Sequence, residues 1–296
     1  MRCLRCCWKL LSACALLKYW LVCCLILLVW SEVDEAGVNI ARHVVVQGAF
    51  QETGAVFEGS PVYAADVAGK HVTLVRLRGE LVYAQDLAEC FKGLELVVFL
   101  SRHSSVSGTP TLSVHVPGNL GLAELGGLPR TVSVAPACAM HAALKTMMQR
   151  ASGLAYEVSY ECTHHGPSLS VPALFVELGS SVQNWRDQAA ARVVADAALA
   201  AVKAFGVSGG KAVVGVGGPH YNMKFTRLAL ADKAVFGHII PKYAVNRVDE
   251  TLLRHCVERT VEPVSHVVLD WKGIRGEDKP GLVSVIGALG LTYEKV

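Results

Sequence analysis

The stretch Leu94-Glu95-Leu96-Val97-Val98-Phe99-Leu100 is short, mostly apolar and rich in β-branched and aromatic residues. Such a run is typical of a strand that is buried on both faces of a sheet. Three later runs have the same character: ALFVEL at 173–178, KAVVGV at 211–216 and HVVLD at 266–270. Because strands of this kind occur in parallel sheets covered by helices, they predict an α/β fold.

Helical periodicity fills the intervals between these runs. It predicts helices over 136–153 and 249–259, and a long Ala-rich helix that Asn184 and Asp187 cap and that ends at Gly206. Segments that alternate apolar with polar residues, at 71–77, 111–116 and 156–161, predict half-exposed strands. The sequence therefore predicts one domain over residues 22–296, with a mixed, largely parallel sheet flanked by helices.

The first 30 residues have two interpretations. From Leu10 to Trp30 only Lys18 interrupts an apolar run, and basic residues precede it, as in a signal peptide or a membrane anchor. However, the run at 25–30 leads into SEVDEAGVNI (31–40), which indicates a buried first strand, a polar turn and a helix. Membrane insertion there would remove part of the core. We therefore expect residues 1–21 to be a disposable extension, with a membrane anchor as the alternative.

Charge and cysteine usage limit the partners and the compartment. Four of the 28 Lys and Arg precede the first acidic residue, which leaves 24 basic against 25 acidic residues in the remainder. This balance excludes a nonspecific nucleic-acid binder that relies on overall positive charge, so a nucleic-acid partner needs a local patch. The four cysteines beyond residue 24 are scattered without paired spacing, which suits a reducing, cytoplasmic location.

The segment ECTHHGPS (161–168) concentrates groups that can move protons or bind a metal. Adjacent side chains of an extended strand point to opposite faces, so His164 and His165 reach one site only if the chain turns there. Gly166 and Pro167 supply such a turn. Other histidines, at 103, 115, 220 and 238, also lie where an apolar run breaks into Gly, Pro or Ser. Strand ends of this kind often carry functional residues, so the pattern predicts one convergent site.

Three further motifs supply candidate substrate contacts. In LSRHSSVSGTP (100–110), a cation, a histidine and hydroxyls suit an anion or a polarised carbonyl; VGVGGPHYNMKFT (214–226) and GHIIPKYA (237–244) offer aromatic rings for stacking and cations for phosphates. None is a GxSxG, GxGxxG or Walker motif, and each could instead be an ordinary turn. The candidates for substrate binding are Arg102, Ser104, Tyr221, Lys224, Arg227, His238, Lys242 and Tyr243.

Together these segments resemble a known family. RHSSVSGTPTLSVHVPGN (102–119), ECTHHGPS with FVELGSS (175–181), GVGGPHYNMKFT (215–226), GHIIPKYA and LDWKG (269–273) occur in an order and spacing similar to the archaeal and plant type of D-aminoacyl-tRNA deacylase. The resemblance covers residues 25–296. Cys162 departs from the pattern, because a small residue such as Ala or Val is expected there.

The resemblance implies a function and a cofactor. It implies hydrolysis of the ester between a D-amino acid and tRNA, which prevents D-amino acid toxicity in translation, and a core like the peptidyl-tRNA hydrolase and nucleoside phosphorylase folds. It also implies zinc, for which His103, His164 and His165 are the candidate ligands. The catalytic candidates are His164, His165, Glu161, His103 and His220, and the basic and aromatic candidates would meet the CCA end of the tRNA.

Two alternatives remain open at this point. One is a related hydrolase or phosphorylase that acts on peptidyl-tRNA or a nucleoside, and the other is a noncatalytic RNA-binding protein with structural histidines. No feature of the sequence indicates a protein partner, so we expect a monomer.

Overall fold

The computed structural model describes residues 25–207 and 210–296. The predicted extension over residues 1–21 lies outside these residues. Within the described part of the chain, no helix combines the length and the apolar character needed to cross a membrane.

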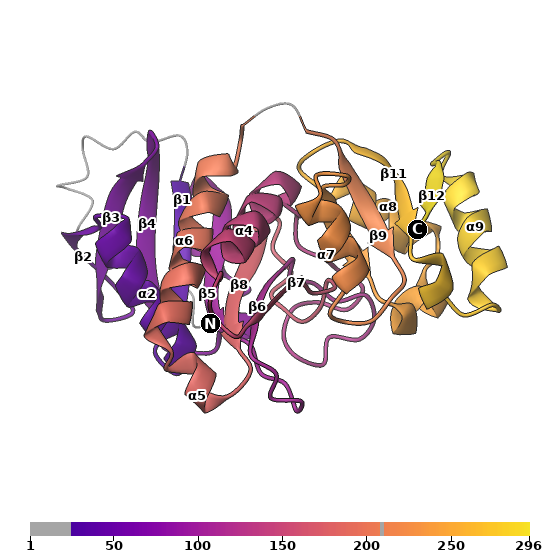
Figure 1. Cartoon of the computed structure of the whole chain (residues 1–296). Coiled ribbons are helices and arrows are strands. Elements are labelled where there is room, and N and C mark those ends of the chain that lie inside the picture. Colours follow the sequence, from indigo (N-terminus) through magenta and orange to yellow (C-terminus); the bar gives the residue numbers. More distant parts are fainter. Residues whose placement is uncertain (1–24, 208–209) are drawn as a thin grey trace.

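An eight-stranded sheet forms the larger part of the molecule (Figure 1). Pairing is parallel through its centre, from β4 through β1 and β5 to β8, and antiparallel at β2–β3–β4 and between β8 and β6, while β7 lies parallel to β6 at the edge. In spatial order the strands are β2 (Gln51–Phe57), β3 (Ser60–Val67), β4 (Lys70–Leu77), β1 (Leu25–Ser31), β5 (Leu94–Arg102), β8 (Ala173–Gly179), β6 (Thr111–His115) and β7 (Glu157–Tyr160).

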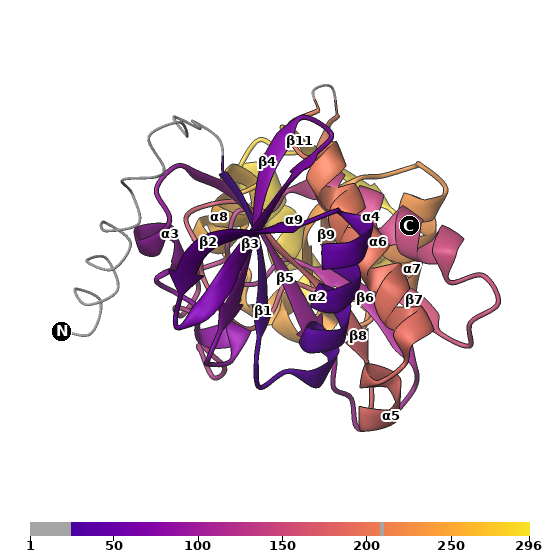
Figure 2. The same cartoon turned by 90° about the vertical axis from the view of Figure 1, so that its left-hand side faces the viewer.

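Both faces of this sheet are buried. Helices α2 (Glu35–Gln47), α4 (Ala137–Arg150) and α6 (Gln188–Ala204) cover one face and lie together on one side of the sheet in Figure 2. The opposite face packs against the 3₁₀ helix η1 (Leu81–Tyr83) and the short helix α3 (Leu87–Cys90). Burial of both faces explains why the central strands are continuous apolar runs.

A second, four-stranded sheet is parallel throughout, in the order β10 (Phe236–Ile240), β9 (Ala212–Val216), β11 (Val264–Leu269) and β12 (Tyr293–Lys295). Its outer face packs against α8 (Glu250–Glu258) and α9 (Asp278–Ala288), and its inner face against α7 (Met223–Leu230). The remaining elements are α5 (Val182–Trp185), η2 (Lys242–Arg247) and η3 (Trp271–Gly273). One hydrophobic cluster includes residues of both sheets, so their cores are continuous.

The structure confirms the predicted mixed α/β fold and its largely parallel sheet. The four apolar runs form β5, β8, β9 and β11, and the run at 25–30 begins the chain's first described strand, β1. The one-domain boundary at residue 22 and the likeness to the peptidyl-tRNA hydrolase and nucleoside phosphorylase folds stay predictions.

Two expectations about local structure were wrong. Asn184 does not cap the long helix, because it belongs to α5, where its side chain accepts from Ser180 and Ser181; the cap of α6 is Asp187. The second concerns 71–77, 111–116 and 156–161, which were expected to be half exposed. Most residues of β4 and β7 are buried, and so is every residue of β6. Its polar residue Ser113 lies in register with Glu177 of β8, so the polar face of β6 points into the interior of the protein.

Asp187 should contribute to the stability of the helix that covers the sheet. Its Oδ1 atom accepts from the backbone N–H groups of Ala189 and Ala190, at 2.9 and 3.1 Å. We expect Asp187→Ala to lower the free energy of unfolding in urea by about 1 kcal/mol, because two N–H groups lose their acceptor. Asp187→Asn keeps an oxygen acceptor and should retain most of this stability. Equal losses in the two variants would contradict the capping role.

Candidate active site

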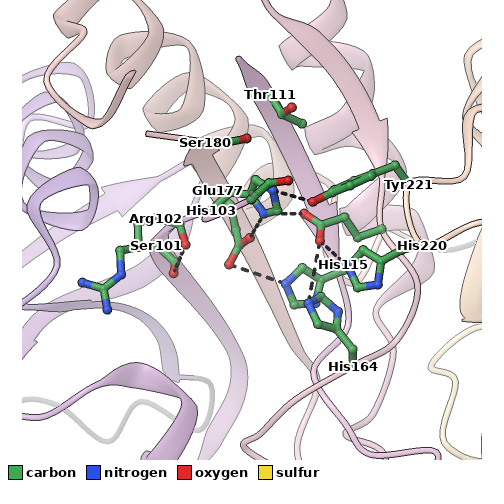
Figure 3. Close-up of polar contacts among 12 residues, drawn as sticks. Ser101, Arg102, His103, Thr111, His115, His164, Glu177, Ser180, His220 and Tyr221 are labelled. Carbon is green, nitrogen blue, oxygen red and sulfur yellow. Dashed lines mark hydrogen bonds and ion pairs between the residues drawn. The ribbon is translucent and has the colours of Figure 1, made fainter. Parts of the chain in front are cut away.

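Two buried carboxylates lie at the centre of the site. Glu161 follows β7 and its side chain is fully buried, and Glu177 lies within β8 and is almost as inaccessible. His103, which directly follows β5, lies between them: its Nδ1 atom is 3.3 Å from Oε1 of Glu161 and 3.4 Å from Oε2 of Glu177 (Figure 3). One imidazole therefore compensates two acids at once.

The pKa values follow from this arrangement. Burial by itself lowers the pKa of His103, but its contacts with Glu161 and Glu177 outweigh burial and raise it to about 11. Burial likewise opposes ionisation of the acids, yet His103 and its neighbours bring the pKa of Glu177 down to about 2 and that of Glu161 well below its usual range. At neutral pH the cluster therefore holds two carboxylates and a protonated His103.

A second imidazole completes the charge balance. His220, in the loop after β9, places Nε2 2.9 Å from Oε2 of Glu161, while its Nδ1 lies 3.1 Å from both the Tyr243 hydroxyl and Sγ of Cys162. Burial lowers the pKa of His220, but the contacts with Cys162 and Glu161 raise it to about 10. His220 is therefore protonated as well.

Three other histidines each direct Nδ1 towards a backbone carbonyl. Nδ1 of His115 lies 3.3 Å from the carbonyl of Val116; the same atom of His164 lies 2.8 Å from Cys162 O, and that of His165 lies 2.7 Å from Gly166 O. Because a carbonyl can only accept, each Nδ1 carries a proton. Nε2 of His164 and His165 can then present a lone pair, whereas Nε2 of His115 lies 3.6 Å from Oε1 of Glu177.

His164 and His165 are neutral, whereas His103 and His220 are protonated. Burial, followed by the neighbouring imidazoles, lowers the pKa of His164 well below its usual range and that of His165 to about 4. The ring centroid of His164 lies 4.2 Å from that of His115 and 4.3 Å from that of His165. The three imidazoles therefore form one compact group, in which His164 and His165 are uncharged.

The turn after His165 is fixed by backbone packing. A Cβ atom on Gly166 would lie 2.2 Å from the backbone nitrogen of Gly127, so only glycine permits this approach. The Gly166 N–H donates to the carbonyl of Leu125 at 2.8 Å. The loop before the turn and the loop over 118–130 therefore position each other, and both imidazoles of the pair reach one site.

The donor atoms could hold a metal ion. Within the described residues, three sets of donor atoms each lie within 4.8 Å of one another: His115 with His164 and His165, Cys162 with His164 and His220, and His103 with Glu161 and Glu177. Two buried atoms in these sets, Nε2 of His115 and Oε1 of Glu161, have no hydrogen-bond partner among the described residues. Histidine ligands of metals usually donate their other N–H to a carbonyl or carboxylate, as the first set does.

The structure does not group His103 with His164 and His165, the set predicted from the sequence. His103 is held between the two carboxylates, and His115 takes its place beside the histidine pair. The sequence placed His115 among the histidines of one convergent site, but neither His115 nor Glu177 was selected as a catalytic or metal-binding candidate. The available signals were a histidine at the end of a strand and a single acid inside the apolar run FVEL.

Two cavities meet at the histidine pair. The larger, of about 480 Å³, is lined by Arg102, Ser104 and Tyr221 together with both carboxylates, and the smaller, of about 260 Å³, is lined by Tyr243. Both are lined by Leu125, His164 and His165. Tyr221 also contacts the cluster directly, because its hydroxyl lies 2.8 Å from Nε2 of His103.

Other predicted substrate contacts lie outside both cavities. Lys224 pairs with Asp270 at 2.5 Å, and Arg227 and Lys242 are exposed on α7 and η2. His238 is fully buried and lies 3.1 Å from the Thr163 hydroxyl and 3.0 Å from the carbonyl of Arg259. Both nitrogens of His238 are therefore engaged within the protein, which leaves none for a substrate.

Comparison with known proteins identifies related chains. A family model described as D-aminoacyl-tRNA deacylase matches residues 90–294. The chain is 37% identical over 269 residues to a D-aminoacyl-tRNA deacylase of Thermococcus kodakarensis, covering 89% of this chain and 97% of the relative, and 36% identical over 271 residues to that of Pyrococcus abyssi, covering 90% and 97%. The crystal structure of a conserved protein of unknown function is similar with a TM-score of 0.82 and 30% identity, over 92% of this chain and 95% of the other.

The buried His238 should make the protein sensitive to acid. Burial lowers its pKa to about 4, so the folded state resists the proton that the unfolded state takes up near the ordinary value of 6.5. The stability contributed by neutral His238 is therefore complete above pH 6.5 and falls as the pH drops towards 4, by about 3 kcal/mol.

The His238→Gln variant, whose side chain stays neutral, should not lose this stability at low pH. Urea unfolding of both proteins from pH 7 to pH 4 tests the difference, since other titrating groups are common to the two. A constant difference in the free energy of unfolding over this range would show that His238 does not titrate as expected.

Proposed function

The chain belongs to the D-aminoacyl-tRNA deacylase family, and we propose that it hydrolyses the ester that joins a D-amino acid to the terminal ribose of tRNA. The observation that supports this chemistry is a single buried cluster that holds ionised carboxylates, protonated imidazoles and neutral imidazoles beside a cavity. Ester hydrolysis needs a proton acceptor for water, a donor for the developing oxyanion and an acid for the leaving oxygen. The family membership does not favour the alternatives of a nucleoside phosphorylase or a noncatalytic RNA-binding protein.

Glu161 is the proposed proton acceptor. Its Oε2 atom is hydrogen-bonded to His220. Its Oε1 atom makes no hydrogen bond within the described residues and is held by the 3.3 Å ion pair with Nδ1 of His103, and Glu161 lines the larger cavity. The attacking water, held beside the histidine pair, would pass a proton to this oxygen as its own oxygen bonds to the ester carbon.

Tyr221 is the proposed oxyanion donor. Protonated His103 donates Nε2–H to the Tyr221 oxygen, so the phenolic O–H of Tyr221 is left to donate elsewhere. A donor that itself accepts a charged hydrogen bond is polarised and donates more strongly. Tyr221 lines the larger cavity, where the carbonyl oxygen of the ester would accept from it.

His220 is the proposed acid. It is protonated and partly accessible, with 29% of its side chain exposed, so it can donate to the ribose oxygen as the carbon–oxygen bond of the ester breaks. Oε1 of Glu161 then releases its proton to water in the cavity, and His220 takes up a proton from water. Water is consumed, the products are the D-amino acid and tRNA, and both side chains regain their initial charge.

Zinc fits the group of His115, His164 and His165. We propose His115, His164 and His165 as its ligands, because three imidazole nitrogens that leave one position open are typical of catalytic zinc sites. When bound, zinc would supply a Lewis acid for the carbonyl or for the attacking water. The sequence-predicted ligand His103 is better suited to its place between the carboxylates. The scattered cysteines support the cytoplasm as the location in which a tRNA substrate would be met.

The substrate and the metal can be tested together. We expect the purified protein to release D-tyrosine from D-tyrosyl-tRNA and to leave L-tyrosyl-tRNA intact. Treatment with a chelator should abolish turnover, and added zinc should restore it. Equal turnover of the D- and L-esters would contradict the proposed function, and full activity after verified removal of zinc would contradict the metal.

The oxyanion role of Tyr221 makes a separate prediction. Tyr221→Phe removes only the hydroxyl and should lower kcat for D-tyrosyl-tRNA by about 10² to 10³. Tyr63→Phe, on β3 and outside both cavities, is the matched control and should keep the activity of the unmodified protein. If Tyr221→Phe retained kcat within a factor of about three, the oxyanion donor would have to be another group.

A further inference from the structure

We propose that the two cavities divide the substrate, with the terminal adenosine and its phosphate in the smaller cavity and the aminoacyl group in the larger one. Arg247 and Tyr243 then recognise the tRNA end. This assignment rests on the proposed function, because it takes an aminoacyl ester of tRNA as the substrate.

The shared wall fixes where the ester must lie. His164 and His165 line both cavities, and so does Leu125. An ester bond placed against the histidine pair therefore has one arm directed into each cavity. The substrate has two unlike arms: one carries an ammonium group and an amino-acid side chain, and the other carries a ribose, a base and a phosphodiester.

Charge distinguishes the larger cavity. Four carboxylates line it, and its cations are each engaged: Arg102 pairs with Glu80 at 3.0 Å, and the imidazoles of His103 and His220 contact the buried acids. No cation among the described lining residues is left for a phosphate, so a phosphodiester would be repelled there. An ammonium group suits such a lining. The four acids are Asp34, Glu80, Glu161 and Glu177.

The smaller cavity offers an unpaired cation. Arg247 is exposed, and the structure records no acid bound to its guanidinium within the described ranges. The neighbouring acid Asp249 is occupied by Arg130, at 2.7 and 2.8 Å. One acid, the exposed Glu124, lines this cavity, against four in the larger one. A Cβ atom on Gly121 would lie 2.5 Å from Nη1 of Arg247, so the guanidinium lies directly against the backbone of the loop over 118–130. Arginine is well suited to phosphate because its planar fork can donate two parallel hydrogen bonds.

The smaller cavity also offers apolar surface for a base. Tyr243 lines it and is 49% exposed. Leu122 and Leu125 line the same cavity, and they are 75% and 45% exposed. Exposed side chains of this kind bury apolar area only when a ligand covers them, and an unstacked base prefers aromatic and apolar surfaces. The exposed rim also lets a polynucleotide continue towards solvent.

Arg247→Gln tests the phosphate contact. We expect KM for D-tyrosyl-tRNA to rise about tenfold with kcat unchanged, since the phosphate is bound equally in the ground and transition states. The slope of log KM against log salt should fall by about one. KM for 2′(3′)-O-D-tyrosyladenosine, which has no phosphate, should not change. Arg254→Gln, the same substitution at an exposed position of α8, is the matched control.

Val33→Phe tests the other arm. Val33 lines the larger cavity and is 51% exposed, so a larger side chain narrows that cavity without disturbing a core. It should lower kcat/KM for D-tyrosyl-tRNA about tenfold more than for D-alanyl-tRNA. Equal losses for both substrates, or a rise in KM for the tyrosyladenosine with Arg247→Gln, would overturn the division of the substrate.

Direct binding of the trinucleotide CCA separates this inference from the proposed function. We expect Arg247→Gln, but not Arg254→Gln, to weaken CCA binding. If the unmodified protein binds CCA through Arg247 but hydrolyses no D-aminoacyl-tRNA, the proposed function fails and the nucleotide site stands. If it hydrolyses D-tyrosyl-tRNA while Arg247→Gln changes neither CCA binding nor KM, the inference fails alone.

Discussion

The burial of Glu161 and Glu177 is the constraint on which the site depends. Removing an unpaired carboxylate from water costs several kcal/mol even after a protein relaxes around it, so two neighbouring carboxylates require cations in contact. His103 meets both acids, and His220 meets Glu161 from the other side. The ends of β5 and β9 must therefore bring their histidines to the same point. Loss of either imidazole would leave a buried charge uncompensated.

The same constraint divides the histidines into two kinds. Nε2 of His164 is 3.7 Å from Glu161, a longer contact than that of His220, and three surrounding imidazoles oppose a further positive charge there. Its Nδ1 proton is also committed to a backbone carbonyl. One residue type thus supplies protonated groups that stabilise carboxylates and neutral groups that offer lone pairs. The difference arises from position relative to Glu161 and Glu177 and from the backbone acceptor that each ring meets.

The sequence predicted the fold better than the roles within the site. Apolar runs such as 94–100 predicted the central strands because burial on both faces leaves no room for polar residues. The alternation of polar and apolar residues at 111–116 led to a wrong prediction of exposure. Ser113 and His115 face a polar interior, and a strand in that position has the same sequence pattern as one that faces solvent. Clustering of histidines at strand ends indicated a site. It could not show that His103 lies between two acids, because that contact depends on the register of β5 with β8 and on the loop after β7.

The active site also joins the two sheets. Glu161 and His164 come from the segment that follows the larger sheet, whereas His220 and Tyr221 follow a strand of the smaller one. Backbone hydrogen bonds also join the two parts. Cys162 N–H donates to the carbonyl of His220 at 3.0 Å, and Thr163 N–H donates to that of Ile239 at 2.9 Å. The charge cluster is therefore complete only when the two sheets are docked. Substitution of Glu161 would disturb both stability and activity, whereas removal of the Tyr221 hydroxyl leaves the charge balance intact, so only the latter separates chemistry from folding.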